Sequence, residues 1–177
     1  FLLGLEETGC TTADSGWQRC HVVLRRGQDA IAVMPMYLKS HSYGEYVFDW
    51  SWADAWQRSG LDYYPKLVSA IPFTPATGPR LCVGEGEDGA AITITVLQAI
   101  QELASKRGIS SWHVLFPSHT VSDELLQLGM HQRVATQFHW FNDGYETFDD
   151  FLSTFSSRKR KNLRRERKRV AEQGLRL

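Results

Sequence analysis

Residues 88–108 read Asp88-Gly-Ala-Ala-Ile-Thr-Ile-Thr-Val-Leu-Gln-Ala-Ile-Gln-Glu-Leu-Ala-Ser-Lys-Arg-Gly108, and Ile109-Ser-Ser-Trp-His-Val-Leu-Phe116 follows directly. The apolar residues of the first part recur at helical spacing and share one face: Ile92, Val96, Ile100, Leu103 and Ala104. Asp88 can cap the start of this helix, and Gly108 can end it. The second part reads as a strand that Pro117 ends. A helix that leads directly into a strand is typical of an α/β protein.

On the N-terminal side the sequence predicts a hairpin and then mixed short elements. These are the end of a helix at 1–7, strands at Trp17–Arg25 and Ala30–Leu38, a short strand at Glu45–Asp49, helices near Trp52–Ser59 and Tyr64–Ala70, and a strand at Arg80–Val83. Pro35 lacks an amide hydrogen, so the second hairpin strand should be interrupted, bulged or at an edge there.

After Pro117 the sequence predicts further helices and one more strand. We expect a helix opened by a capping box at Thr120–Asp123 and ended by Gly129, a strand at Gln132–Phe141, a helix opened by a capping box at Thr147–Asp150, and a basic helix from Ser157 to Gln173. Antiparallel strands therefore come first and helix–strand units follow. The predicted fold class is α/β, with a mixed sheet, helices on both faces and a basic helical arm after it.

The charge of the chain is divided between two regions. Residues 158–177 hold ten Lys and Arg against two acidic residues, a net charge of +8, whereas the preceding residues carry a net −8. The free amides at the start of the basic helix and its rows of cations suit a phosphate or a nucleic-acid backbone. A solvated connecting helix held by the acidic remainder of the chain explains the same pattern.

Tyrosine and tryptophan are concentrated between residues 39 and 66, interleaved with polar residues. They could form either a buried cap of the core or a ligand-binding lid. Glu45, Asp49 and Asp54 could supply a general base there, or could be capping and surface carboxylates. The glycine-rich loop Gly84–Gly89 precedes a helix, but its three acidic residues favour a plain loop over a phosphate nest.

Several protein classes are disfavoured by the sequence. No run of 18 apolar residues occurs, so no membrane-spanning helix is expected, and the first residues lack the basic region of a signal peptide. The three cysteines show no CxxC spacing and the histidines are scattered, which favours reduced thiols in the cytoplasm and no metal site. The absence of an initiator Met and the final residues, Leu175-Arg-Leu177, suggest a fragment of a longer chain.

Five runs of this sequence resemble one family: Pro35–Asp49, Tyr63–Lys66, Pro72–Arg80, Gln137–Trp140 and Ser156–Asn162. The family is the predicted bacterial N-acyltransferases of the GNAT superfamily, described as peptidoglycan biosynthesis/recognition proteins and similar to the Fem-type aminoacyl transferases. The resemblance implies a GNAT-like lobe at 1–145, a basic helical arm at 146–174 and the start of a second lobe at 175–177. The acyl-CoA phosphate loop of the superfamily is not recognisable after Val83, so the donor site is expected in the second lobe.

The resemblance also implies a reaction, the transfer of an acyl or aminoacyl group to an amine acceptor. Acyl-CoA or aminoacyl-tRNA would be the donor, and no cofactor would be permanently bound. The residues assigned to catalysis are His41 as base, Tyr43 or Tyr46 as acid, and Asp49. Those assigned to the substrate are Lys39, Glu45, Tyr64 and Lys66, and those assigned to phosphate are Ser157, Arg158, Arg160, Lys161, Arg164 and Arg165.

Two other functions are compatible with the same residues. The chain could be a non-catalytic binding module that grips RNA, or an anionic envelope polymer, through residues 158–169. It could also be a lobe that only shapes the site of a second lobe. Binding to a phosphate backbone predicts a steep loss of affinity with salt, whereas a small acyl donor in a pocket predicts little salt dependence.

Overall fold

Pro35 divides a long hairpin into four short strands. They are β1 (Trp17–Arg19), β2 (Val22–Arg26), β3 (Asp29–Met34) and β4 (Tyr37–Lys39). Pro35 has no amide hydrogen to donate, and the next amide, that of Met36, donates to His21 Nδ1 at 3.1 Å and not to a strand. The ladder therefore breaks here, and each of the two predicted strands is in fact two. The predicted interruption at Pro35 is confirmed.

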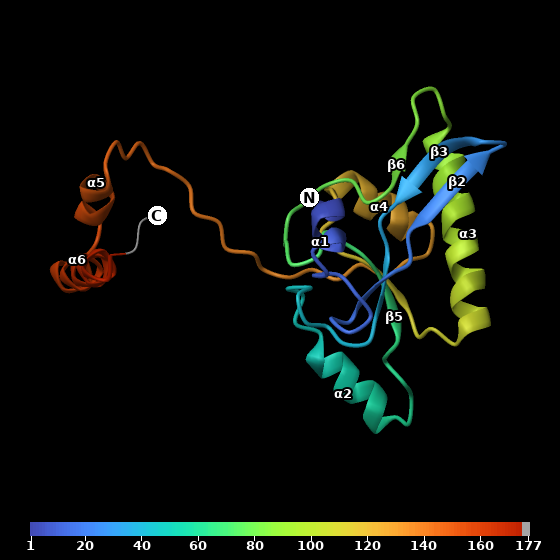
Figure 1. Ribbon diagram of the computed structural model, residues 1–177, viewed down its shortest axis with the longest axis horizontal. Helices are drawn as coiled ribbons and strands as arrows, with labels where there is room; N and C mark the ends of the chain where they lie inside the picture. The colour runs from blue at the N-terminus through green and yellow to red at the C-terminus, as the bar shows by residue number, and fades with distance from the viewer. Residues whose placement is uncertain (175–177) are drawn as a thin grey trace. The chain divides into compact units, whose positions relative to one another are not determined.

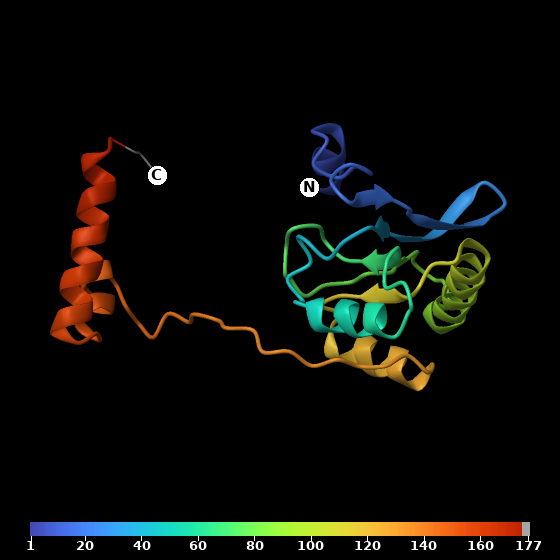
Figure 2. The ribbon, with the colours of Figure 1, turned by 90° about the horizontal axis from the view of Figure 1, so that it is seen from below.

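The break assigns the two ends of the hairpin to different sheets. One sheet has the order β1-β4-β5-β7, with β5 at Lys66–Ser69 and β7 at Trp112–Val114, and the other has the order β2-β3-β6, with β6 at Cys82–Val83. β5 and β7 are parallel, and all other pairs are antiparallel. The prediction of an α/β protein with a mixed sheet is confirmed, but the strands form two sheets and not one. Figure 2 shows the β2–β3 hairpin extending past the end of the four-stranded sheet.

Two predicted elements are wrong because tertiary contacts override the local pattern. Tyr64–Ala70 contains strand β5 and no helix, and all four residues of β5 are buried between β4 and β7. A segment with every side chain buried carries no amphipathic periodicity to identify it. The strand predicted at Glu45–Asp49 is a loop, in which Tyr46 and Phe48 have φ angles of 61° and 50°. Such angles are incompatible with a strand.

Four helices accompany the sheets in this part of the chain (Figure 1). They are α1 (Leu2–Glu7), α2 (Trp50–Arg58), α3 (Gly89–Arg107) and α4 (His119–Gln127). The ends of α3 are as predicted, because the Asp88 side chain accepts from the Ala91 amide at 3.1 Å and Gly108 has a φ of 62°. α4 begins earlier than predicted, because Ser118 and not Thr120 is its cap and accepts from the Val121 amide.

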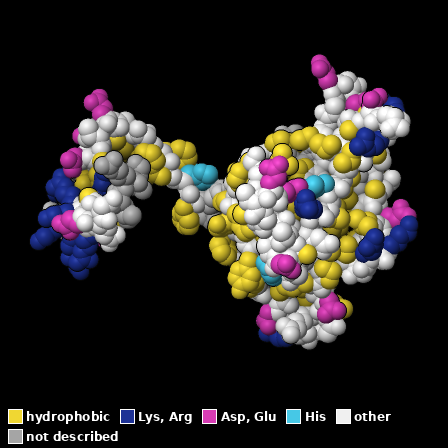
Figure 3. All heavy atoms as spheres, in the orientation of Figure 1, with side chains coloured by type: hydrophobic (Ala, Val, Ile, Leu, Met, Phe, Trp, Pro, Cys, Tyr) yellow, Lys and Arg dark blue, Asp and Glu magenta, His cyan; other side chains and the backbone are white. Residues whose placement is uncertain are grey.

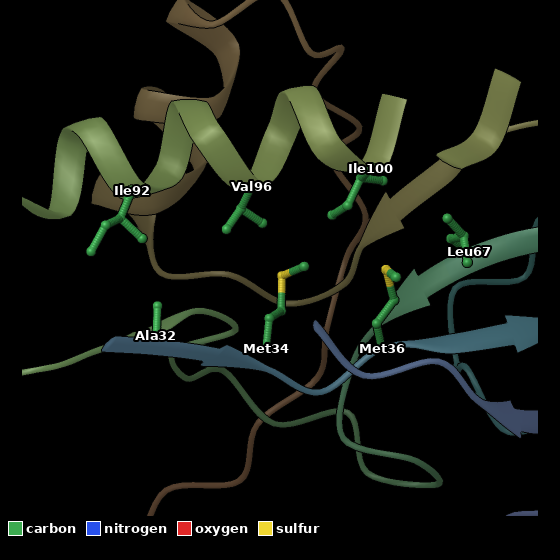
Figure 4. Close-up of a cluster of buried hydrophobic side chains, with 7 residues drawn as sticks. All are labelled: Ala32, Met34, Met36, Leu67, Ile92, Val96 and Ile100. Atoms are coloured by element: carbon green, nitrogen blue, oxygen red, sulfur yellow. The ribbon is translucent and has the colours of Figure 1, made fainter. Parts of the chain in front are cut away.

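The main core lies between α3 and the strands. Figure 4 shows Ile92, Val96 and Ile100 of α3 pointing toward a row of side chains on the strands and the link between them, Ala32, Met34, Met36 and Leu67. All seven side chains are buried. A second cluster contains Trp17, Tyr37, Val68, Ala70 and Leu115. These two clusters support β4 and β5 from both sides, and these two strands carry the lysines of the candidate site.

The structure describes residues 1–174. They divide into two compact units, Phe1–Ala135 and the described residues from Thr136 onward. The second unit holds α5 (Phe148–Ser153), with the predicted Thr147–Asp150 capping box, and α6 (Ser157–Glu172), the predicted basic helix. The division at residues 145 and 146 and the role of α6 as an arm stay predictions. The predicted start of a second lobe at 175–177 lies outside the described residues.

The strand predicted at Gln132–Phe141 is absent. These residues have no strand assignment, and the side chains of Val134 and Phe138 are 86% and 94% exposed. Alternating apolar residues do not make a strand unless a neighbouring strand completes the hydrogen-bond ladder. No helix among residues 1–174 is both long and apolar enough to cross a membrane.

Candidate functional site

The loop between β4 and α2 buries its polar residues and exposes its aromatic ones. Ser42, Glu45 and Asp49 are each 5% exposed or less, whereas Tyr43 and Phe48 are 67% and 72% exposed. This is the reverse of the usual distribution, in which carboxylates face water. These buried polar residues lie on the side of the loop that faces strand β5, where Lys66 binds all three. The reason for this inversion is a lysine on the neighbouring strand.

Lys66 of β5 holds the three buried residues together. Its ammonium donates to Ser42 Oγ at 2.8 Å, to Glu45 Oε2 at 2.8 Å and to Asp49 Oδ2 at 2.6 Å. These three bonds use all the hydrogens of an ammonium group, which is needed because Lys66 is completely buried. Two ion pairs and a hydroxyl thus anchor the loop to the centre of the four-stranded sheet.

Two tyrosines extend this buried network. Tyr63 donates to Asp49 Oδ2 at 2.6 Å. The Tyr64 hydroxyl lies 2.8 Å from Ser42 Oγ, and Tyr64 is only half-buried. A continuous hydrogen-bonded chain therefore runs from the Lys66 ammonium through Ser42 to a hydroxyl at the edge of the buried region. Tyr64 is the member of this network that is most accessible to a ligand.

The two carboxylates of the network differ in their electrostatics. Burial opposes ionisation of Asp49, but hydrogen bonds from Lys66, Ser42 and Tyr63 outweigh it and hold its pKa at about 2. Burial raises the pKa of Glu45 above its ordinary value, although Lys66 opposes this shift. Glu45 Oε1 and Asp49 Oδ1 are both buried without a hydrogen-bond partner among residues 1–174. The network therefore retains two unused acceptor positions.

Lys39 of β4 is a second buried lysine with a different environment. Its ammonium lies 3.6 Å from the ring centroid of Trp17 and donates to the Tyr43 carbonyl at 3.1 Å. Burial lowers its pKa to about 7, with repulsion from Lys66 adding to the shift and Glu45 opposing it. The Lys39 ammonium is therefore held by a cation–π contact and one carbonyl, whereas the Lys66 ammonium is held by two carboxylates and a hydroxyl.

The remaining predicted residues of this region lie outside the buried network. His41 accepts a hydrogen bond from the Tyr43 amide through Nδ1 at 3.2 Å, and its ring packs against Gly16. Any Cβ at position 16 would collide with that ring. Tyr43 and Tyr46 are exposed. The structure thus gathers Lys39, Glu45, Asp49, Tyr64 and Lys66, while the catalytic roles of His41, Tyr43 and Tyr46 stay predictions.

Sequence reasoning did not assign roles to three residues that complete the site. Ser42 links Lys66 to Tyr64, Tyr63 binds Asp49, and the buried Arg80 supports the neighbouring loop. The Arg80 guanidinium donates to the carbonyls of Ala76, Gly78, Pro79, Leu115 and Phe116. The signal available for Ser42 was its place among the polar residues that are interleaved with the rings of this segment. Nothing in the local pattern identifies Tyr63 or Arg80.

The residues predicted to bind phosphate lie on α6, in the second unit. Apart from the half-buried Arg160 they are exposed: Ser157, Arg158, Lys161, Arg164 and Arg165. Arg164 pairs with Asp149 at 2.8 Å, whereas Arg158, Arg160 and Lys161 have no carboxylate partner within the described part of the chain. Within that part, no three His, Cys, Asp or Glu side chains are grouped as metal ligands.

Comparison with known proteins gives one match, and it covers the whole chain. The model of the FemAB_like family, described as peptidoglycan biosynthesis/recognition, matches residues 1–177. The searches of curated proteins and of solved structures gave no match. The family match includes the segments that form the buried lysine–carboxylate network. The chain therefore belongs to the FemAB_like family of peptidoglycan biosynthesis and recognition proteins.

Proposed function

We propose that this protein is an N-acyltransferase, which transfers an acyl or aminoacyl group from acyl-CoA or aminoacyl-tRNA to an amine acceptor. Membership of a peptidoglycan biosynthesis/recognition family supports the reaction class. The observation that carries the proposal is the hydrogen-bonded chain Lys66–Ser42–Tyr64, which leads from a buried ammonium to the hydroxyl of a half-buried tyrosine. A GNAT-like fold and a second lobe belong to the same proposal.

The role of Tyr64 follows from the direction that we propose for its hydrogen bond with Ser42, in which either oxygen can be the donor. Ser42 Oγ accepts from Lys66, and the Ser42 hydroxyl hydrogen is shared between the Tyr64 oxygen and Asp49. The hydrogen of Tyr64 is then available to a ligand, and the positive charge behind the chain strengthens it as a donor. When an amine attacks a thioester or ester carbonyl, negative charge develops on the carbonyl oxygen. Tyr64 would stabilise that oxyanion.

Asp49 and Glu45 hold this chain in place through their bonds to Lys66. Asp49 stays ionised because its pKa is held at about 2, so it keeps the Lys66 ammonium in position. Glu45 Oε2 binds a second hydrogen of the same ammonium. Of the three acceptors around Lys66, Ser42 is the one that leads to the half-buried Tyr64. The leaving thiolate or alkoxide takes up the proton that the amine acceptor loses, so the donor departs as a free thiol or alcohol.

The test is steady-state kinetics of the Tyr64→Phe variant. The ring remains and the hydroxyl is lost, so kcat should fall by roughly 100- to 1000-fold with little change in KM, as for loss of one oxyanion donor. Ser42→Ala should lower kcat as well, because it disconnects Tyr64 from Lys66. Tyr145→Phe, in the second unit, is the matched control and should behave as wild type. Full activity of the Tyr64→Phe variant would show that the Tyr64 hydroxyl takes no part in the reaction.

The donor can be identified by thermal unfolding of the protein with acetyl-CoA, longer acyl-CoAs and transfer RNA. A ligand at about 100 times its Kd stabilises the folded state by about 2.7 kcal/mol and should raise Tm by several degrees. A shift with acyl-CoA supports the small-donor reaction. A shift with RNA alone that disappears at high salt supports charged RNA as donor, or the alternative of an RNA-binding module that uses α6.

A further inference from the structure

Two neighbouring hollows in the second unit share Phe148 as a common wall. The first has a volume of about 430 Å³, is also lined by Arg164 and Arg167, and is called the arginine hollow here. The second, of about 480 Å³, is lined mainly by rings that include Trp140 and Phe151, and is called the aromatic hollow. Figure 3 shows the Lys and Arg side chains of this unit gathered over α6, with hydrophobic side chains nearer α5. Volumes of this size are typical of small-molecule sites.

The aromatic hollow offers a flat apolar ring to a ligand. The Trp140 side chain is 65% exposed, although its indole already packs against the Phe151 ring, with centroids 5.9 Å apart and an interplanar angle of 89°. Phe151 packs in the same way against Phe155, with centroids 4.9 Å apart. No charged side chain of residues 1–174 lines this hollow. Any nucleobase can stack on such a ring, because every base has a π-face.

The arginine hollow offers guanidinium groups whose hydrogens are mostly unused. The Arg167 guanidinium carbon lies 4.0 Å from the centroid of the Phe148 ring, and Arg167 has no carboxylate partner among residues 1–174. Arg164 donates from Nη2 to Asp149 Oδ1 at 2.8 Å, in an exposed ion pair. A guanidinium has five N–H donors in a fork that matches a phosphate. Asp149 is the one carboxylate that lines this hollow beside the two arginines, so the hollow favours an anionic ligand.

The shared residue Phe148 determines which ligand could fill both hollows. Because Phe148 lines each of them, the cationic groups and the flat apolar rings lie on either side of a single residue. A ligand that fills both needs a planar ring and an anionic group joined by a short spacer, and the base, sugar and phosphate of a nucleotide have this arrangement. An apolar protein segment would leave the two arginines without a partner, and inorganic phosphate would leave the aromatic hollow empty.

We propose that the two hollows together bind one nucleotide, either a free nucleoside monophosphate or a nucleotide of an RNA chain. The base stacks on Trp140, and the phosphate accepts hydrogen bonds from Arg167 and Arg164. This site differs from the phosphate-binding row predicted on α6, because that row includes neither Trp140 nor Arg167. It is also independent of the transferase reaction, since it lies in the second unit and Tyr64 lies in the first.

The first experiment is calorimetric titration of the protein with adenosine 5′-monophosphate, with adenosine and with inorganic phosphate. The monophosphate should bind roughly tenfold more tightly than either of the other two, because it alone occupies both hollows. Equal affinities for the monophosphate and for inorganic phosphate would show an anion site that takes no base. That result, or a complete lack of binding of the monophosphate, would overturn the proposal.

Two substitutions test the two halves of the site separately. Arg167→Gln should weaken binding of the monophosphate roughly tenfold, because the charge-assisted hydrogen bonds to phosphate are lost. Trp140→Leu should weaken it by a similar factor of roughly ten, because leucine keeps the hollow apolar but cannot stack on a base. Both side chains are exposed, so each variant should keep the fold of the second unit, which circular dichroism checks.

Each substitution has a matched control elsewhere in the chain. Arg169→Gln removes a charge from the same helix at a residue that lines neither hollow, and Trp52→Leu removes a tryptophan that is 51% exposed in the first unit. Both controls should bind the monophosphate as wild type does. Equal losses for Arg167→Gln and Arg169→Gln would assign the binding to the charge of α6 as a whole. Unchanged binding by Trp140→Leu would contradict stacking of the base.

A short single-stranded oligoadenylate distinguishes the two sources of the nucleotide. If the site takes a nucleotide of RNA, the oligonucleotide should bind more tightly than the monophosphate, because its other phosphates reach further cations of α6, and Trp140→Leu and Arg167→Gln should both weaken it. Equal affinities would indicate a free nucleotide. Oligonucleotide binding that neither variant weakens would leave only the row on α6 and overturn the proposal. Self-association that Trp140→Leu abolishes, without nucleotide binding, would show an interface between two copies of the chain instead.

Discussion

Lys66 occupies a strand position at which this sheet would ordinarily hold an apolar side chain, since its neighbours Leu67 and Val68 are completely buried. The lysine is tolerated because three acceptors surround its ammonium. A buried cation of this kind contributes less to stability than to the position of its partners. At the scale of single residues, therefore, the buried Lys66 ammonium fixes the position of the loop between β4 and α2, because it binds Ser42, Glu45 and Asp49.

Replacement of Lys66 tests this role. Lys66→Met keeps the volume but leaves Glu45 and Asp49 buried without their cation, so the free energy of unfolding should fall by roughly 3–5 kcal/mol. Urea denaturation monitored by circular dichroism measures this loss of free energy of unfolding. The control is Lys106→Met, which removes the exposed ion pair with Glu102 on α3 and should cost about 0.3–0.5 kcal/mol. Similar small losses for both variants would contradict a structural role for the buried network.

Lys39 predicts how stability depends on pH. Its pKa is about 7 in the folded protein, against an ordinary value of 10.5, so between these values the unfolded chain binds more protons than the folded one. Stability should therefore rise with pH from about 7 toward 10.5. Measurements are best made below about pH 9.5, because burial also raises the pKa of Tyr37 and Tyr63 and their ionisation favours unfolding at higher pH.

The comparison variant is Lys39→Met, in which the titrating group is absent. The free energy of unfolding of wild type minus that of the variant should increase from pH 7 to pH 9.5 in urea titrations. A difference that is constant with pH would show that Lys39 titrates at its ordinary pKa and is not desolvated in the folded protein.

At the scale of elements, α3 is the part of the fold that its own sequence specifies most completely. Its caps, its apolar face and its end are all local features, and the structure confirms each of them. β5 is the opposite case, because its burial on every side depends on β4 and β7, which lie far away in sequence. The prediction of a strand at Gln132–Phe141 was wrong for a related reason, because a strand requires a neighbouring strand that the local pattern cannot supply.

Two isoleucines on α3 test the contribution of its buried face. Ile100 is 2% exposed and packs in the main core, whereas Ile94, of the same type on the same helix, is 43% exposed. Ile100→Ala should lower the free energy of unfolding by about 2–5 kcal/mol because it leaves a cavity. Ile94→Ala should change it by about 0.5 kcal/mol or less. Denaturant unfolding of both variants would contradict the core assignment if the two losses were equal.

At the scale of the whole molecule, the chain is two units with different chemistry. The first holds both core clusters and the lysine network, and the second holds the basic α6. Opposite charges in the two regions were already visible in the sequence. The hydrogen-bonded chain of the transferase proposal lies in the first unit, and the residues predicted to bind phosphate or RNA lie in the second.

Local sequence was enough to predict the α/β class, the extent of α3 and α6, the break at Pro35 and the segment of the candidate site. These depend on local periodicity, capping and proline geometry, which neighbours in sequence decide. Long-range contacts were needed to show that Glu45 and Asp49 point inward, that Ser42 connects Lys66 to Tyr64, and that Tyr43, Tyr46 and Phe48 are exposed. The reason is that a buried ammonium attracts its acceptors across 17 to 24 residues of sequence, a separation at which no local pattern operates.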